Sequence, residues 1–294
     1  MAGKDLEEVR YQMLRPAQVI ARRQACPVAY LPLGPLEWHG PHNPLGTDGL
    51  CAEGLAILCA QKGGGLAFPP LWYGENRLEC LVDATAKDRD EIAGAMELPP
   101  ENFTPARQPF TQVEQSLHYQ RLLLHILAEA ETLGFELAVF VAGHAPLLDH
   151  ARAAALLQNQ RARNRPGGML AWAFWETLLV RDRYPGLGDH GAGWETSQNL
   201  ALHPETVDLA VLPPKGGKIV HATGRIPPQE ATAAFGRETL AAAAEIAVQE
   251  VRHRLAHKKQ YLAHGRSLAE GLWREAQVPA PAGRESLDLP PARR

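Results

Sequence analysis

The sequence has little of what marks secreted or membrane-spanning proteins. Cysteine occurs only 4 times in 294 residues and never in CxxC spacing, so we expect reduced thiols rather than a disulfide framework. No apolar run approaches the roughly 20 residues that a membrane-spanning helix needs. The N-terminal stretch is charged and lacks the hydrophobic core of a signal peptide. We therefore expect a cytoplasmic protein that does not contact membranes.

An excess of one charge is also lacking. The formal net charge is −3, and the Lys and Arg residues are spread along the chain, so no broad electropositive surface is expected. Nucleic acid and anionic membranes are therefore not expected as partners. What is present is an ordinary globular composition, 45% apolar and 21% charged, in a chain long enough for one large domain or two small ones.

Short β-rich apolar runs alternate with longer helical stretches along the chain. This order predicts an α/β fold, a three-layer α/β/α sandwich whose central sheet is mainly parallel and covered on both faces. The predicted strands cover residues 27–33, 66–71, 135–141 and 169–175. The first predicted helix begins at an N-cap at Thr47 or Asp48. Further helices are predicted over residues 115–133, 151–163, 194–202 and 229–261.

Two segments do not fit a minimal α/β unit. Residues 73–111 form a long connection with at most one short helix, and such connections are usually functional or disordered. We leave open whether this insertion is a lid over a substrate or a contact between subunits. Residues 265–294 are polar and rich in Pro, which is typical of an arm or a tail. We therefore expect one domain over residues 1–264.

Three clusters of residues could carry chemistry. Glu37, His39 and Asp48 follow the first predicted strand, although an ExH with a nearby Asp is a weak signal by itself. His144 follows the strand at 135–141, where a buried core histidine is the common alternative. Glu195 would open a short helix, where an acidic first turn is the common alternative. Together they supply two His and three carboxylates, a set suited to two divalent ions about 3.5 Å apart, such as Zn²⁺, Mn²⁺ or Fe²⁺.

Three motifs resemble those of the creatininase (creatinine amidohydrolase) family. They are LPLGPLEWHGPHNPLGTD at 31–48, GH at 143–144 and HGAGWETS at 190–197, in the family's order and spacing. The resemblance implies five metal ligands: Glu37, His39, Asp48, His144 and Glu195. It further implies Asp48 as the bridge between two ions, His190 as the group that moves a proton to the leaving atom, and His42 as an orienting residue.

The resemblance implies a hydrolase in which a hydroxide shared by the two ions attacks a small, polar, cyclic substrate. We expect opening of a cyclic amide or a related C–N bond first. The alternative is a C–C hydrolase of a cyclic diketone such as 3-dehydro-scyllo-inosose, an activity associated with the family. A non-catalytic metal-binding protein of the same fold is the third possibility. The resemblance also implies a homo-oligomer, often a hexamer.

Further residues are expected to contact the substrate. Candidate substrate contacts are Trp38, His42, Tyr73, Glu75, Asn76, Arg77 and Trp194. One departure from the family bears on the choice of substrate. Creatininase proper has a metal-binding Glu two residues after the histidine of the second motif, and this sequence has Pro146 there. A proline side chain has no atom that can bind a metal, which argues against creatinine itself as the substrate.

Overall fold

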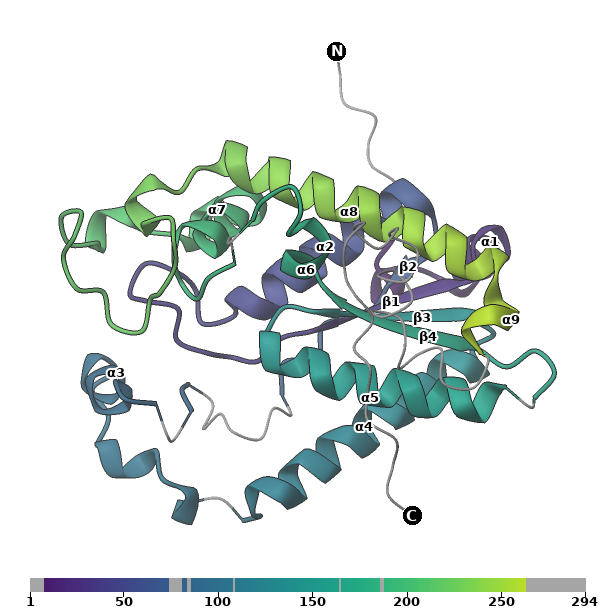
Figure 1. The fold of residues 1–294 in the computed structure, drawn as a ribbon, viewed down its shortest axis with the longest axis horizontal. Helices are drawn as coiled ribbons and strands as arrows, with labels where there is room; N and C mark the ends of the chain where they lie inside the picture. The colour runs from purple at the N-terminus through teal and green to yellow at the C-terminus, as the bar shows by residue number, and fades with distance from the viewer. Residues whose placement is uncertain are drawn as a thin grey trace, which may run out of the picture.

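The computed structural model describes residues 8–73, 81–83, 86–107, 109–163, 165–185 and 188–262. Its sheet has four parallel strands in the order β2-β1-β3-β4 (Figure 1). The strands are β1 (Val28–Leu33), β2 (Leu66–Ala67), β3 (Leu137–Ala142) and β4 (Leu170–Trp175). Every residue of β1 and β3 is buried, as expected for parallel strands that helices cover on both faces.

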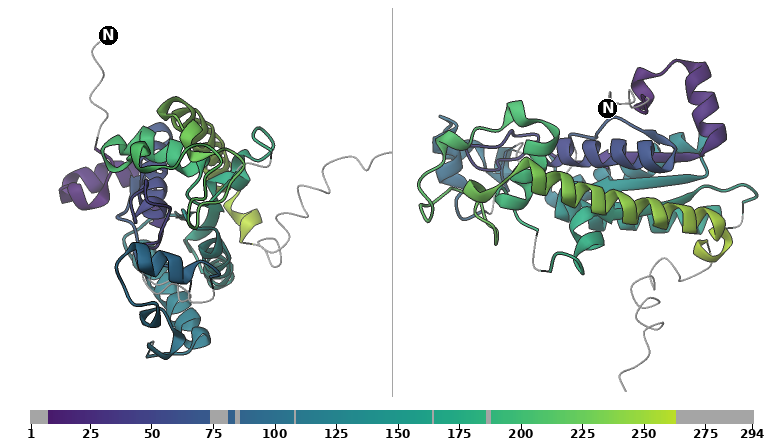
Figure 2. Two further views of the ribbon diagram at one scale, coloured as in Figure 1. Left: turned by 90° about the vertical axis from the view of Figure 1, so that its left-hand side faces the viewer. Right: turned by 90° about the horizontal axis from the view of Figure 1, so that it is seen from above.

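Helices cover both faces of the sheet, which confirms the predicted three-layer α/β/α architecture (Figures 1 and 2). One layer contains α2 (Thr47–Gly63), α6 (Glu176–Val180), α7 (Gly193–Leu202) and α8 (Ala233–Ala256). The other contains α4 (Gln112–Thr132) and α5 (Ala145–Ala162). The helix α1 (Pro16–Ala25), which the sequence pattern did not predict, lies beside β2. No helix of the described ranges has the length and apolar character that a membrane span requires.

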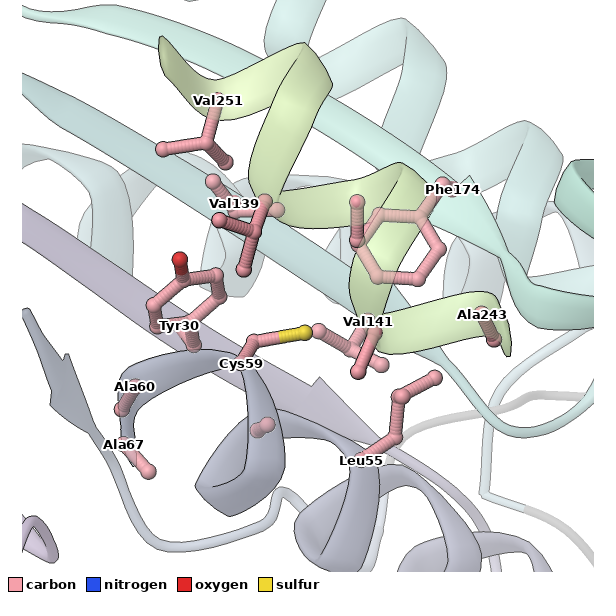
Figure 3. Close-up of a cluster of buried hydrophobic side chains, with 14 of the residues drawn as sticks. Tyr30, Leu55, Cys59, Ala60, Ala67, Val139, Val141, Phe174, Ala243 and Val251 are labelled. Carbon is pink, nitrogen blue, oxygen red and sulfur yellow. The ribbon is translucent and has the colours of Figure 1, made fainter. Parts of the chain in front are cut away.

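The alternation of side chains along the strands divides the core between the two faces. Tyr30, Val139 and Val141 point toward α2 and α8, where they pack with Leu55 and Val251 (Figure 3). The residues between them contribute to the core on the opposite face, together with α4 and α5. Among the described cysteines, Cys26, Cys51 and Cys59 are free thiols, as the composition predicts, and Cys80 lies outside the described residues.

Several predicted boundaries were wrong for local physical reasons. The second strand ends at Ala67 because Pro69 and Pro70 have no N–H to donate to a neighbouring strand. The helix expected at 151–163 already begins at Ala145, since Pro146 is tolerated in a first turn, where its missing N–H would have no partner. The helix expected at 229–261 consists of a 3₁₀ turn at Pro228–Glu230, then α8, then the short α9 (Lys258–Tyr261).

The described part of the insertion packs against the loop that follows β1. It contains α3 (Arg89–Ala95) and 3₁₀ turns at Pro100–Asn102 and Pro105–Arg107. Its apolar side chains form a small cluster around Trp38, which we call the insertion cluster, composed of Trp38, Leu81, Val82, Ile92, Ala93 and Phe103. The Trp38 indole Nε1 also donates a 2.9 Å hydrogen bond to the carbonyl of Val220. The insertion is therefore attached to the segment that carries the first motif.

Candidate metal centre

The strand order places the first two motifs at the switch point of the sheet. The chain leaves β1 toward β2 on one side and later returns to β3 on the other, so β1 and β3 are neighbours whose connections run in opposite directions. Their last residues, Leu33 and Ala142, are paired in register. In open α/β sheets, ligands bind in the crevice beyond such a pair of carboxyl ends. Glu37 and His39 follow β1, and His144 follows β3.

The five predicted ligands converge in this crevice. His39 Nε2 lies 3.0 Å from Asp48 Oδ1 and 3.5 Å from Glu195 Oε2. His144 Nδ1 lies 3.1 Å from Glu37 Oε2 and 3.2 Å from Asp48 Oδ2. The Asp48 carboxylate thus stands between two histidines, with one oxygen facing each.

Two glycines allow α2 to bring Asp48 into the crevice. A Cβ on Gly34 would lie 2.2 Å from the backbone nitrogen of Gly49, and one on Gly143 would lie 2.0 Å from the carbonyl oxygen of Asp48. The first turn of α2 therefore packs directly on the ends of β1 and β3. The prediction that Thr47 or Asp48 caps this helix was wrong, because the N-cap is Gly46 and no side chain caps it. The Asp48 carboxylate consequently faces the centre instead of its own helix.

The carboxylate of Asp189 binds the free backbone N–H groups at the start of α7. Asp189 accepts hydrogen bonds from the backbone N–H groups of Trp194, at 2.6 Å, and Glu195, at 3.1 Å. The carboxylate of Glu195 accepts a 2.7 Å bond from the Gly191 N–H and lies beside His39. Asp189 therefore binds the free N–H groups at the start of α7, and Glu195, although it lies in the first turn, faces the centre.

A buried polar network holds His39 in place. Its Nδ1 lies 3.0 Å from the carbonyl oxygen of Glu37, which accepts from Nδ1–H and leaves Nε2 to face Asp48. Asn43 donates to the His39 carbonyl at 3.2 Å and to Thr196 Oγ1 at 2.9 Å. His42 Nε2 lies 3.0 Å from the same hydroxyl. His42 thus lies behind the predicted ligands, and its orienting role stays a prediction.

The centre suits divalent cations. Glu37 Oε2, His39 Nε2 and Asp48 Oδ2 are buried at ion-pair distances from their neighbours, yet none has a hydrogen-bond partner. Buried polar atoms without partners are costly in free energy, and a cation bound among them would remove that cost. Imidazole and carboxylate donors in this number match Zn²⁺ or Mn²⁺. Glu37, His39 and Asp48 offer ligand atoms that all lie within 4.8 Å of one another.

The electrostatics reflect this concentration of charge. Burial disfavours the charged form of His144, but the neighbouring carboxylates of Asp48 and Glu37 outweigh it and raise the pKa of His144 to about 10. Burial likewise opposes the charge of His39, yet Asp48 and Glu195 raise its pKa well above the ordinary value. Burial raises the pKa of the Glu195 carboxyl. The carboxylates around His39 and His144 thus favour the protonated form of both rings in the metal-free protein.

His190 lies at the mouth of the centre. Its ring stacks on His39 with centroids 4.2 Å apart, and its side chain is 23% exposed. Nε2 lies 2.8 Å from the Trp38 carbonyl oxygen and donates to it, so Nδ1 carries the lone pair and lies 4.0 Å from Glu37 Oε2. Burial and the charge of nearby His39 lower the pKa of His190 to about 4, which favours the neutral ring.

One residue beside the centre was missed by the sequence analysis. His221 lies in the loop before α8, and its ring contacts that of His190 with centroids 4.5 Å apart. His221 also contacts the insertion, because its Nδ1 lies 2.8 Å from Asp88 Oδ1. His221 belongs to none of the three motifs, so no sequence signal marked it. Its positive φ of 51° is rare for a residue with a side chain.

The other predicted substrate contacts lie elsewhere. Trp38 is 7% exposed and lies in the insertion cluster. Trp194 is 2% exposed, packs against Tyr184 and Phe235, and donates to Glu176, so it belongs to the core. Tyr73 is 68% exposed, and residues 75–77, Glu75, Asn76 and Arg77, lie outside the described residues.

The fold and the motifs agree with one family. Residues 12–251 match the family model described as creatinine amidohydrolase. The chain belongs to the creatininase family. This finding confirms the resemblance on which the ligand set was predicted. Two solved creatininase structures that are similar to this chain are described by their metals, one as a Zn–Zn type and the other as an Mn form.

Solved creatininase structures share the fold. A creatininase point mutant superimposes with a TM-score of 0.60 at 21% identity, covering 84% of this chain and 99% of the other. A putative creatinine amidohydrolase from Bacteroides fragilis gives a TM-score of 0.56 at 19% identity, covering 87% and 97%. A 3-dehydro-scyllo-inosose hydrolase from Thermotoga maritima is 33% identical over 66 residues, which is 22% of this chain and 21% of that relative. The match thus spans about a fifth of its length.

Proposed function

We propose that this chain is a two-metal hydrolase that opens small, polar, cyclic amides. The position of Asp48 carries the proposal, because one oxygen faces His39 at 3.0 Å and the other faces His144 at 3.2 Å. A carboxylate between two separate donor sets is what a pair of neighbouring ions requires. Glu37 and His144 would complete one site with Asp48, and His39 and Glu195 would complete the other. Zn²⁺ and Mn²⁺ are the first candidates, and Fe²⁺ also accepts this donor set.

When bound, two divalent ions would make a water molecule nucleophilic near neutral pH and would polarise the substrate carbonyl. The part of the chain in the reaction would then be proton transfer. His190 presents an unprotonated Nδ1 at the mouth, and the Trp38 carbonyl fixes that tautomer by accepting from Nε2–H. In this position His190 would take a proton from the attacking water and deliver it to the leaving nitrogen. Burial of the ligands at 0–12% side-chain exposure keeps bulk water from competing.

A second candidate reaction is the hydrolysis of a C–C bond in a cyclic diketone. It is supported by the 66-residue match to the 3-dehydro-scyllo-inosose hydrolase. The same ions and the same histidine would serve, because hydrolysis at a ring ketone also begins with attack of water on a carbonyl. The amide is ranked first because the family model is described as an amidohydrolase. Creatinine itself is disfavoured, since Pro146 lies in the first turn of α5 and offers no ligand atom.

We also propose the wider arrangement that the sequence predicts. Residues 1–264 form one domain, and the protein acts in the cytoplasm as a homo-oligomer, as the family resemblance implies. We place the insertion at the rim of the centre. The contact of Asp88 with His221, which lies beside His190, supports this position. The tail at 265–294 remains an arm in this proposal.

The first test joins metal analysis to a substrate screen. Wild type, Asp48→Asn and the control Asp149→Asn, which changes an exposed carboxylate on α5, are analysed for bound metal. Each is then assayed with cyclic amides and cyclic diketones. We expect about two ions per chain in wild type and the control, and loss of both ions and activity in Asp48→Asn.

The outcomes separate the candidate functions. Turnover of amides alone would support the first proposal, and turnover of diketones alone would support the second. Metal without turnover of either class would favour a non-catalytic metal-binding protein. Retention of two ions and full activity in Asp48→Asn would refute the bridging role.

A further inference from the structure

We propose a third cation position at the mouth of the centre, formed by Glu37, His190 and His221, which binds Zn²⁺ more weakly than the two inner sites. The inference rests on the proposed function in one respect, since it takes the inner sites to be filled first. It goes beyond that function because it assigns a metal-binding role to His221 and a supporting role to the insertion.

The three side chains meet the geometric requirement for a shared ion. They offer one ligand atom each, and these atoms all lie within 4.8 Å of one another. His190 Nδ1 lies 4.0 Å from Glu37 Oε2, and the rings of His190 and His221 meet edge to face with centroids 4.5 Å apart. Bonds of about 2.0–2.2 Å from each atom to Zn²⁺ need only small adjustments of these side chains.

The hydrogen bonds behind the two histidines prepare them as ligands. Metal-binding histidines usually donate their other ring N–H to a carboxylate or a backbone carbonyl, which fixes the tautomer. His190 donates Nε2–H to the Trp38 carbonyl at 2.8 Å. His221 donates Nδ1–H to Asp88 Oδ1 at 2.8 Å, which leaves its Nε2 unprotonated. Both rings therefore have one free nitrogen and one oxygen partner behind the other nitrogen.

The exposure of the ligands predicts a weaker and more accessible site. The side chains of His190 and His221 are 23% and 26% exposed, whereas that of His39 is fully buried. Glu37 Oε2 also lies 3.1 Å from His144, so the third ion would share this carboxylate with an inner site. An ion here would occupy the Nδ1 lone pair that His190 needs for proton transfer. Excess Zn²⁺ should consequently inhibit the proposed reaction.

The test measures Zn²⁺ stoichiometry and affinity by equilibrium dialysis of the full chain. The variants are His221→Gln, which removes a ligand, and Asp88→Asn, which weakens the partner behind it. The matched control is Glu91→Gln, because Glu91 lies in the first turn of α3, close to its N-cap Asp88, and pairs with Lys218 at 2.6 Å. A second control, His125→Gln, changes an exposed histidine on α4.

We expect a third, weaker Zn²⁺ ion in wild type and in both controls. It should be absent from His221→Gln, and its dissociation constant should rise about 10–100-fold in Asp88→Asn. Saturation of wild type at two ions, or a third ion that survives His221→Gln unchanged, would overturn the proposal. Fewer than two tight ions would instead contradict the proposed function, and a weak ion lost with His221→Gln would still support the third position. If His221→Gln fails to fold, Asp88→Asn decides the matter.

Discussion

Replacement of Trp38 by Ala should release the insertion while the main core stays folded. The Trp38 side chain is 7% exposed and packs with five other buried side chains of the insertion cluster. It also makes the 2.9 Å bond from Nε1 to the Val220 carbonyl. Truncation of a buried Trp to Ala costs about 3–5 kcal/mol. A cluster of six buried side chains has few other contacts that could absorb such a loss.

This cost translates into a measurable change in local opening. Since about 1.4 kcal/mol corresponds to a factor of ten, the open population of the segment should rise by about two to three and a half orders of magnitude. Amide hydrogen exchange followed by mass spectrometry on peptides from 86–107 measures this change. Trp38→Phe is the control, because it keeps most of the packing and loses the hydrogen bond, a loss of about 0.5–1.5 kcal/mol.

Local release of the insertion and global unfolding should affect different peptides. Exchange in α5, whose buried face belongs to the core between the sheet and α4, should change little. Unchanged exchange at 86–107 would show that Trp38 does not anchor the insertion. A uniform increase over α5 and 86–107 would show that the insertion cluster is not an independent unit. Either result would refute the argument.

Three further predictions concern the centre. His190→Gln should lower kcat about 10²–10⁴-fold while the two inner ions stay bound, and unaltered turnover would remove His190 from the proposed proton transfer. Gly143→Ala should displace Asp48 and cost about 1–3 kcal/mol, visible in thermal unfolding as a Tm several degrees lower and in dialysis as weaker metal binding. Metal binding near pH 7 should release protons, because the raised pKa values keep His39 and His144 protonated in the metal-free protein. The heat of metal binding, measured by calorimetry, should therefore vary with the ionisation enthalpy of the buffer. The proton release from His144 should fade as the pH rises through about 10. Heats that do not depend on the buffer would contradict this prediction.

The sequence predicts the sheet well because its strands are buried on both faces. Such strands appear as short continuous apolar runs, and β1 and β3 lie within one or two residues of their predicted limits. Their ends mark the crevice, so the positions of Glu37, His39 and His144 follow from the order of the elements together with the motifs. The edge strand β2 is less regular, since two prolines stop it after two residues.

The residues that support the centre depend on tertiary contacts that no local pattern reveals. Asp88 and His221 are 133 positions apart and meet only because the insertion packs beside the loop before α8. The role of Asp48 at the start of α2 could not be read from the sequence either. An acidic residue in a first turn is equally compatible with a cap and with a ligand, and the choice depends on how closely Gly34 and Gly143 let α2 approach the strands.

The alternation of side chains in the first motif explains why the insertion and the centre are joined. Successive side chains of an extended segment point to opposite sides, so Glu37 and His39 face the crevice together while Trp38 faces away. That outward side chain is the one around which the insertion cluster forms. The carbonyl of the same residue accepts from His190. A change in how the insertion packs on Trp38 would therefore affect the predicted ligands on both sides of it and the histidine that the proposed reaction uses. The insertion thus supports the position of the candidate centre.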